Sequence, residues 1–140
     1  MTPGGTSAGR LALVLLSAVG LGGVGCSPGS AATPLTVELT AHYSHYAPTA
    51  VTVPHGRPIR FVIHNTDAID HEFIVGDDAV QLRHERGTEA HHGVRPTEVS
   101  IAALRDATTT IEFDRATTLT YACHLPGHFA YGMHGTLRIT

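Results

Sequence analysis

Apolar and polar residues alternate along most of the chain after residue 34, in short runs rich in β-branched and aromatic residues. An alternation with a period of two residues predicts strands with one buried face, and turn residues separate the runs. Strands are predicted over residues 35–41, 49–54, 58–65, 71–76, 97–101, 108–114, 118–123 and 135–140. About eight short strands with little helical periodicity predict an all-β fold, either an antiparallel sandwich or a barrel.

Residues 77–96 interrupt this pattern with a polar, His-rich segment that is long for a hairpin loop. Loops of this length in compact domains are usually functional or disordered. The segment begins with "DDAVQLRHER", which predicts one or two helical turns before Gly87.

The first quarter of the chain has a different pattern. Arg10 is followed by "LALVLLSAVGLGGVG", an apolar run of fifteen residues without a charge, which ends at Cys26. This pattern predicts a secretory signal. It has one basic residue, an apolar run too short to span a bilayer comfortably, and small residues before a break. The sequence "GVGC" resembles the lipobox of bacterial lipoproteins, although Gly23 stands where that family usually has an aliphatic residue. The resemblance implies that Cys26 is lipidated; the alternative is that Cys26 is removed with the signal.

The predicted organisation has three parts: a signal peptide of the lipoprotein type over 1–26, a flexible tether over 27–34 and one domain over 35–140. We therefore expect an exported protein. It would be held at the outer face of the bacterial cytoplasmic membrane by a lipid on Cys26, or released into the periplasm or the medium.

Composition narrows the chemistry. All nine basic residues are Arg, and loss of the signal leaves eight Arg against twelve Asp and Glu, so the domain is mildly acidic and no nucleic-acid partner is expected. The main excess is eleven histidines in 140 residues. Once Cys26 is lipidated or removed, Cys123 is the remaining thiol, and no internal disulfide can form. An unpaired thiol in an oxidising compartment is a hazard unless it is a functional group.

The stretch "TYACHLPGHFAYGMHG", residues 120–135, holds Cys123, His128 and Met133 at even intervals. Soft sulfur donors stabilise Cu(I), and imidazole accommodates both oxidation states of copper. Two His, one Cys and a weak axial Met form a blue-copper centre, and Pro126–Gly127 predicts the turn that brings His128 back towards Cys123. The second His must then come from another part of the chain.

With these motifs the chain resembles the cupredoxins. The spacing Cys123-x4-His128-x4-Met133 is that of the auracyanin and rusticyanin branches, and "NTDAIDHEFIVGD" resembles the segment that supplies the first histidine in plastocyanin- and azurin-like bacterial copper proteins. The resemblance covers about residues 35–140 and implies a Greek-key β-sandwich. It implies that His71, Cys123 and His128 are the equatorial ligands of one copper ion and that Met133 is the axial ligand.

Several alternatives stay open from the residues alone. Cys123 and Met133 could be ordinary core residues, and His64 could replace His71 as the ligand. The segment "CHLPGHFAYGM" also resembles the C-terminal signature of multicopper oxidases, in which the Cys has a His on both sides. Here Ala122 precedes Cys123 and the chain contains no His-x-His pair, so an oxidase acting alone is not expected. His134 is expected to be a solvated loop residue.

The His-rich loop raises a second possibility. His84, His91 and His92, together with Glu85 and Glu89, could bind a further divalent ion through imidazole and carboxylate groups, and a solvated polar loop is the alternative. His42 and His45 could extend such a site or decorate an edge strand.

The leading functional hypothesis is a monomeric single-electron carrier, not an enzyme. In the cupredoxin family the loop histidine reaches the surface, and Pro126, Phe129 and Tyr131 would form the apolar patch that docks a redox partner. The alternative is a copper tolerance or delivery protein with an additional His-rich copper site. A redox enzyme would need an open coordination position, and Met133 argues against one.

Overall fold

The computed structural model describes residues 32–87, 92 and 95–140. The predicted signal, Cys26, most of the predicted tether and His91 lie outside these residues. Residues 32–34, at the end of the predicted tether, are exposed and irregular. Over the described part the elements are β1 (Leu35–His42), β2 (His45–Ala47), β3 (Ala50–Val53), β4 (Pro58–Asn65), β5 (His71–Gly76), α1 (Asp78–Glu85), β6 (Glu98–Ile101), β7 (Asp106–Glu112), β8 (Thr117–Ala122) and β9 (His134–Ile139).

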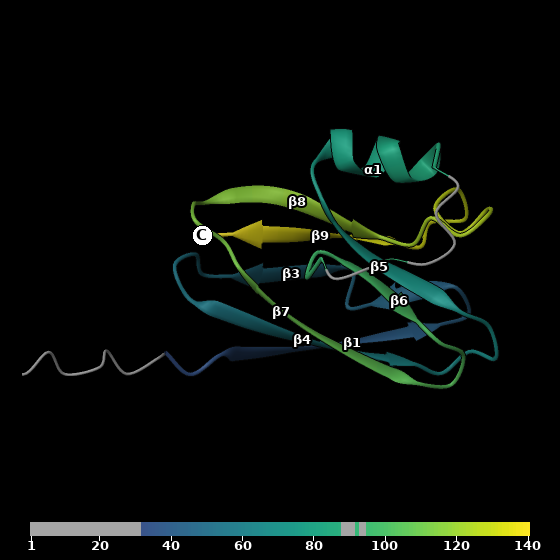
Figure 1. The fold of residues 1–140 in the computed structure, drawn as a ribbon, viewed down its shortest axis with the longest axis horizontal. Coiled ribbons are helices and arrows are strands. Elements are labelled where there is room, and N and C mark those ends of the chain that lie inside the picture. The colour runs from purple at the N-terminus through teal and green to yellow at the C-terminus, as the bar shows by residue number, and fades with distance from the viewer. Residues whose placement is uncertain (1–31, 88–91, 93–94) are drawn as a thin grey trace, which may run out of the picture. The chain divides into compact units, whose positions relative to one another are not determined.

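The strands form two sheets, ordered β2-β1-β4-β7 and β3-β9-β8-β5-β6. Only the pairs β1–β4 and β3–β9 are parallel among the described strand pairs; the others are antiparallel. Figure 1 shows the sheets as two layers, with the chain crossing repeatedly from one to the other. The fold is therefore the expected all-β sandwich, and the sheets do not close into a barrel.

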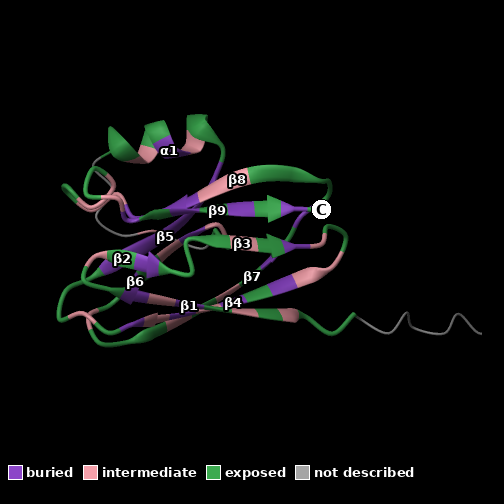
Figure 2. Ribbon diagram, turned by 180° about the vertical axis from the view of Figure 1, so that it is seen from behind, coloured by how far each residue is buried: buried purple, intermediate pink, exposed green. Residues whose placement is uncertain are grey.

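The core lies between the sheets and is built by alternation along the strands. Exposed and buried residues alternate along the six residues of β9, and the buried residues Gly135, Leu137 and Ile139 face inward. Figure 2 shows this alternation of buried and exposed positions along β9. A sheet that is solvated on one face needs only one apolar face, which explains the period of two in the sequence.

β5 is the exception, because all six of its residues are buried. Alternate side chains His71, Phe73 and Val75 belong to the inner face, while the other face is covered by α1, which Figure 1 shows on the outer side of this sheet. Gln81 of α1 donates to the carbonyls of Ile74, Gly76 and Thr120. The helix thereby covers the outer face of β5.

The sequence predictions agree closely with these bounds. The strands predicted at 58–65 and 71–76 are observed at those residues, and the predicted helical turns are α1, capped by the Asp77 carboxylate on the N–H of Val80. β2 was not predicted. Among the described residues, no helix is long and apolar enough to cross a bilayer.

Candidate metal centre

The loop between β8 and β9 is closed by its own backbone hydrogen bonds. The N–H of Cys123 donates to the carbonyl of Met133 at 3.0 Å, and the N–H of Met133 donates to the carbonyl of His128 at 3.0 Å. The N–H of His128 donates to the carbonyl of Leu125 at 2.9 Å, across the turn. Gly127 has φ +90°, a left-handed conformation that favours glycine. The Pro-Gly turn thus returns the chain as expected.

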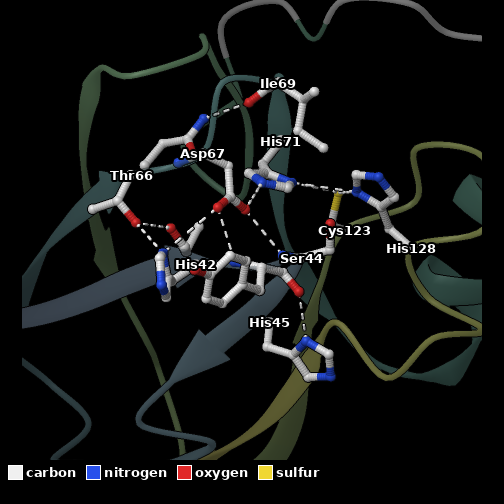
Figure 3. A network of polar contacts seen from close by, with 12 residues as sticks. His42, Ser44, His45, Thr66, Asp67, Ile69, His71, Cys123 and His128 are labelled. Carbon is white, nitrogen blue, oxygen red and sulfur yellow. Dashed lines mark hydrogen bonds and ion pairs between the residues drawn. The ribbon is translucent and has the colours of Figure 1, made fainter.

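Three donor atoms from β5 and this loop converge. Cys123 Sγ lies 3.2 Å from His128 Nδ1 and 3.9 Å from His71 Nδ1, and the two nitrogen atoms are 3.3 Å apart. Figure 3 shows both imidazoles directed at the sulfur. Metal–nitrogen bonds of about 2.0 Å and metal–sulfur bonds of about 2.3 Å at near-trigonal angles separate donors by roughly 3.3–3.8 Å. The donor set therefore fits one thiophilic ion, and these three residues with Met133 are called the cysteine centre below.

His71 is oriented by a carboxylate. Its Nε2 lies 2.9 Å from Asp67 Oδ2, which leaves Nδ1 as the donor directed at Cys123 (Figure 3). Asp67 in turn accepts hydrogen bonds from the backbone N–H groups of Tyr43 and Ser44 at 2.8 and 2.9 Å. Burial alone would raise the pKa of Asp67, but the hydrogen bonds from Ser44, Tyr43 and His71 hold it below its ordinary value. The carboxylate is thus charged at neutral pH and fixed at both oxygens.

Asn65 holds the turn that carries Asp67. Its Nδ2 donates to the carbonyls of Ile69 and Ala102, and its Oδ1 accepts the N–H of Asp67. The side chain is buried, so it is more than a surface turn residue. Asp67 was not anticipated as a functional residue, although it precedes His71 by four residues within the quoted "NTDAIDHEFIVGD".

The thiol of Cys123 is buried and receives a hydrogen bond from the backbone N–H of Glu72 at 3.3 Å. Burial raises the pKa of the Cys123 thiol to about 11 in the metal-free protein. Burial, assisted by the neighbouring His71, lowers the pKa of His128. The metal-free protein at neutral pH therefore presents a neutral imidazole and a protonated thiol.

We expect the affinity of the cysteine centre for copper to rise about tenfold per pH unit between about pH 7 and pH 9. The thiolate is the ligand, so binding displaces one proton from a group whose pKa of about 11 lies above this range. The lowered pKa of His128 means that this imidazole adds no proton release above pH 7. Competition with a chelator of known affinity at pH 7, 8 and 9 measures the slope, and a flat profile would contradict a protonated thiol.

Replacing Asp67 by Ala is expected to weaken copper binding by roughly 10- to 100-fold, because His71 loses the partner that fixes its tautomer and ring orientation. The matched control is Asp70→Ala in the same turn. Asp70 accepts the N–H of Ala103, and no contact between Asp70 and His71 is seen among the described residues. Chelator competition on both variants gives the two affinities. Equal losses would show that the turn as a whole, and not the contact between Asp67 and His71, supports the site.

The remaining candidates for the centre have these places. Met133 is fully buried, and its backbone is hydrogen-bonded to the backbones of Cys123 and His128. Its role as the axial ligand stays a prediction. His64 lies on β4 with its Nδ1 3.0 Å from Asp106, so the structure brings His71 and not His64 to Cys123. His134 is exposed, and its ring lies near Phe129.

The predicted second site is brought together only in part. His84 and His92 come close to each other, with ring centroids 5.2 Å apart, and the third partner is Glu98 of β6. Glu98 was not anticipated because it belongs to a predicted strand, and His91 lies outside the described residues. His42 and His45 contact Thr66 and Tyr43 near Asp67 instead (Figure 3).

The predicted docking residues lie on the loop that holds His128. Pro126 is exposed, Phe129 is half-buried and Tyr131 is 75% exposed. His128 lies between Pro126 and Phe129 in the sequence and is itself partly exposed.

Comparison with known proteins decides the family. A family model for a cupredoxin-like domain matches residues 13–137. The chain belongs to the cupredoxins. Among curated cupredoxin relatives it is similar to the "copper-resistant cuproprotein CopI" of Rubrivivax gelatinosus, with 33% identity over 93 residues, which cover 64% of this chain and 56% of that protein. The protein of the same name from Pseudomonas aeruginosa is 26% identical over 136 residues, covering 74% of this chain and 75% of its own.

Solved structures show the same fold. Auracyanin B superimposes with a TM-score of 0.65 at 24% identity, covering 78% of this chain and 91% of its own. Rusticyanin from Thiobacillus ferrooxidans superimposes with a TM-score of 0.53 at 17% identity, covering 77% of this chain and 79% of its own. At these identities the likeness concerns the cupredoxin fold alone. With the family shown, copper binding is the chemistry that fits the donor set.

Proposed function

We propose that this cupredoxin binds one copper ion at His71, Cys123, His128 and Met133 and serves as an exported single-electron carrier. The observation that carries the proposal is the convergence of one buried thiol and two imidazole nitrogens within 3.9 Å of one another. A copper ion held by such a set supplies a one-electron Cu(II)/Cu(I) couple.

The chain's own residues suit that role. The sandwich keeps water from Cys123 Sγ, and the N–H of Glu72 donates to the sulfur, a contact that tunes a thiolate's donor strength. Asp67 holds His71 in one orientation, so the ligand geometry can stay the same in both redox states. Partly exposed His128, beside Pro126, Phe129 and Tyr131, offers a route to a redox partner that docks on this loop.

The first test is the visible and EPR spectrum of the purified protein titrated with Cu(II), with the bound copper counted. A carrier should show an intense thiolate-to-copper band that saturates at one ion per chain. Weak colour with several ions bound would mean that histidines dominate and would overturn the proposal. Electron self-exchange, followed by mixing oxidised and reduced protein, should be fast because little rearrangement is needed.

A second candidate function is copper tolerance or delivery. It is favoured by the curated names of the sequence relatives, which are called copper-resistant cuproproteins. The aligned part spans little more than half of the Rubrivivax gelatinosus protein, so that name alone does not carry over to this chain. Expression in a copper-sensitive bacterial host distinguishes the two functions. Growth at raised copper that depends on Cys123 would favour tolerance, and a carrier would leave growth unchanged.

We also propose that the protein is exported and anchored to the membrane by a lipid on Cys26, as the leader pattern indicates. Intact mass of the protein from a bacterial membrane fraction would show the lipid. A Cys26→Ala variant should leave the membrane fraction. Equal distribution of the two forms would contradict the anchor.

A further inference from the structure

A second group of buried polar side chains lies on the outer face of the five-stranded sheet. His84 comes from α1, His92 from the segment before β6, and Glu98 is the first residue of β6. Their side chains are only 2 to 8% exposed, and one donor atom from each lies within 4.8 Å of the others. This trio is called the outer cluster. Buried groups of this kind are costly unless they are paired or bind a metal.

The outer cluster is distinct from the cysteine centre because successive residues of β5 point to opposite faces. His71 faces the core and the cysteine centre, while Glu72 faces the outer cluster, with its Oε1 2.9 Å from His92 Nε2. The two sites therefore lie on opposite sides of one strand.

The hydrogen bonds of the two imidazoles orient their donor atoms. His84 Nδ1 lies 2.9 Å from the carbonyl oxygen of Val80, which only accepts, so Nδ1 carries the proton and Nε2 is the acceptor nitrogen. His92 Nε2 contacts the Glu72 carboxylate, which leaves Nδ1 as the acceptor nitrogen. These nitrogens lie 3.7 and 3.9 Å from the carboxylate of Glu98. A backbone carbonyl or carboxylate on the far nitrogen is the usual arrangement behind a metal-binding histidine.

The Glu98 side chain is charged, and one of its carboxylate oxygens can bind a cation. Arg83 and Arg95 contact its Oε1 at 2.9 and 3.1 Å, while Oε2 faces His92. Burial would raise the pKa of Glu98, but Arg95, His84 and Arg83 together hold it below its ordinary value. Both arginines are more than half exposed, so they can move aside when a cation approaches.

The cluster has room beside it. A cavity of about 720 Å³ is lined by Glu72, His84, His92, His124 and residues 125–127 of the loop between β8 and β9. It can hold the water ligands that complete the shell of an ion with three protein ligands. His124 is not a donor in this arrangement, because its two ring nitrogens already contact Gln81 Oε1 at 2.7 Å and Glu85 Oε2 at 2.9 Å.

We propose that His84, His92 and Glu98 form a second metal site, for a divalent transition-metal ion of the class of Zn²⁺ or Cu(II). Two imidazoles and one carboxylate suit these ions, and neither Mg²⁺ nor Ca²⁺, which prefer oxygen ligands alone. The site has no thiolate, so an ion bound there contributes no intense visible band.

The test is calorimetric titration of the purified Cys123→Ser protein with Zn²⁺. This background removes the thiolate, so Zn²⁺ binding reports on histidine and carboxylate ligands. We expect one ion per chain and a loss of affinity of roughly 100-fold or more on adding His84→Ala or Glu98→Gln. The Glu98→Gln change keeps the side-chain size. An unchanged unfolding midpoint of the metal-free variants shows that a lost ligand, and not a lost fold, causes the effect.

Two control variants in the same background separate the outer cluster from other sites. His64→Ala removes a half-exposed histidine on β4, and His128→Ala removes the remaining loop ligand of the cysteine centre. Both should bind Zn²⁺ with unchanged affinity. Failure of the Cys123→Ser protein to bind Zn²⁺ would overturn the second site. Binding that is lost with His128→Ala but kept with His84→Ala and Glu98→Gln would also overturn it.

Discussion

Replacing Cys123 by Ser is expected to remove the intense visible absorption of the copper-loaded protein and to weaken copper binding by roughly 100-fold or more. The band requires a sulfur–copper bond, and a hydroxyl does not ionise to a comparable ligand at neutral pH. Ser is nearly the size of Cys and can still accept the N–H of Glu72, so the sandwich should remain folded. The visible spectrum and a chelator competition of the variant beside the parent measure both effects.

Two further variants serve as controls for that result. Met133→Leu should keep the copper and most of the colour while changing the reduction potential, because only a weak axial ligand is lost. Replacing His84, His91 and His92 together by Ala should leave the colour intact. If the triple variant lost the band, or the Ser variant kept it, the assignment of Cys123 as the ligand would be wrong.

Replacing Phe73 by Ala is expected to reduce the free energy of unfolding of the metal-free protein by about 3–5 kcal/mol, out of a typical total of about 5–15 kcal/mol. Phe73 is fully buried, and its ring centroid lies 6.2, 5.4 and 5.7 Å from those of Tyr46, Phe61 and Tyr121. These rings come from both sheets, so the cavity cannot close without moving one sheet against the other. Urea denaturation of parent and variant gives the difference.

Leu82→Ala is the matched control for the core prediction. Leu82 is 49% exposed on α1, where Ala is an excellent helix former, and the change should stay within about 0.5 kcal/mol. A loss of less than about 1 kcal/mol for Phe73→Ala would mean that the aromatic cluster is not the centre of the core.

Much of the fold could be predicted from local pattern because alternation and turn residues are local signals. The strands at 58–65 and 71–76 show this, and so does α1 with its Asp77 cap. β2 was missed because "HYA" is too short to show a period, and it exists through pairing with β1. A closed barrel could not be excluded, since closure depends on how strand edges meet in space.

The residues of the candidate site also fall into two groups: those that the local sequence predicts and those that only folding brings together. Cys123, His128 and Met133 share one loop, so their spacing could be read directly. Asp67 and Glu98 act through contacts formed only on folding: Asp67 is held by the turn after β1, and Glu98 meets a histidine from α1. Asp and Glu are common in turns and at the starts of strands. Their presence in the sequence therefore does not show that either one contacts a histidine from another part of the chain.

The contact between Asp67 and the β1–β2 turn has a mechanical consequence. Tyr43 and Ser44 form the turn that joins β1 and β2 of the four-stranded sheet, and His71 belongs to the other sheet. The Asp67 carboxylate contacts both and so ties the two layers together at the metal-binding end. An ion that fixes His71 must then also slow the opening of that end. Amide hydrogen exchange at Tyr43 and Ser44, whose N–H groups contact Asp67, would register the loading of the site.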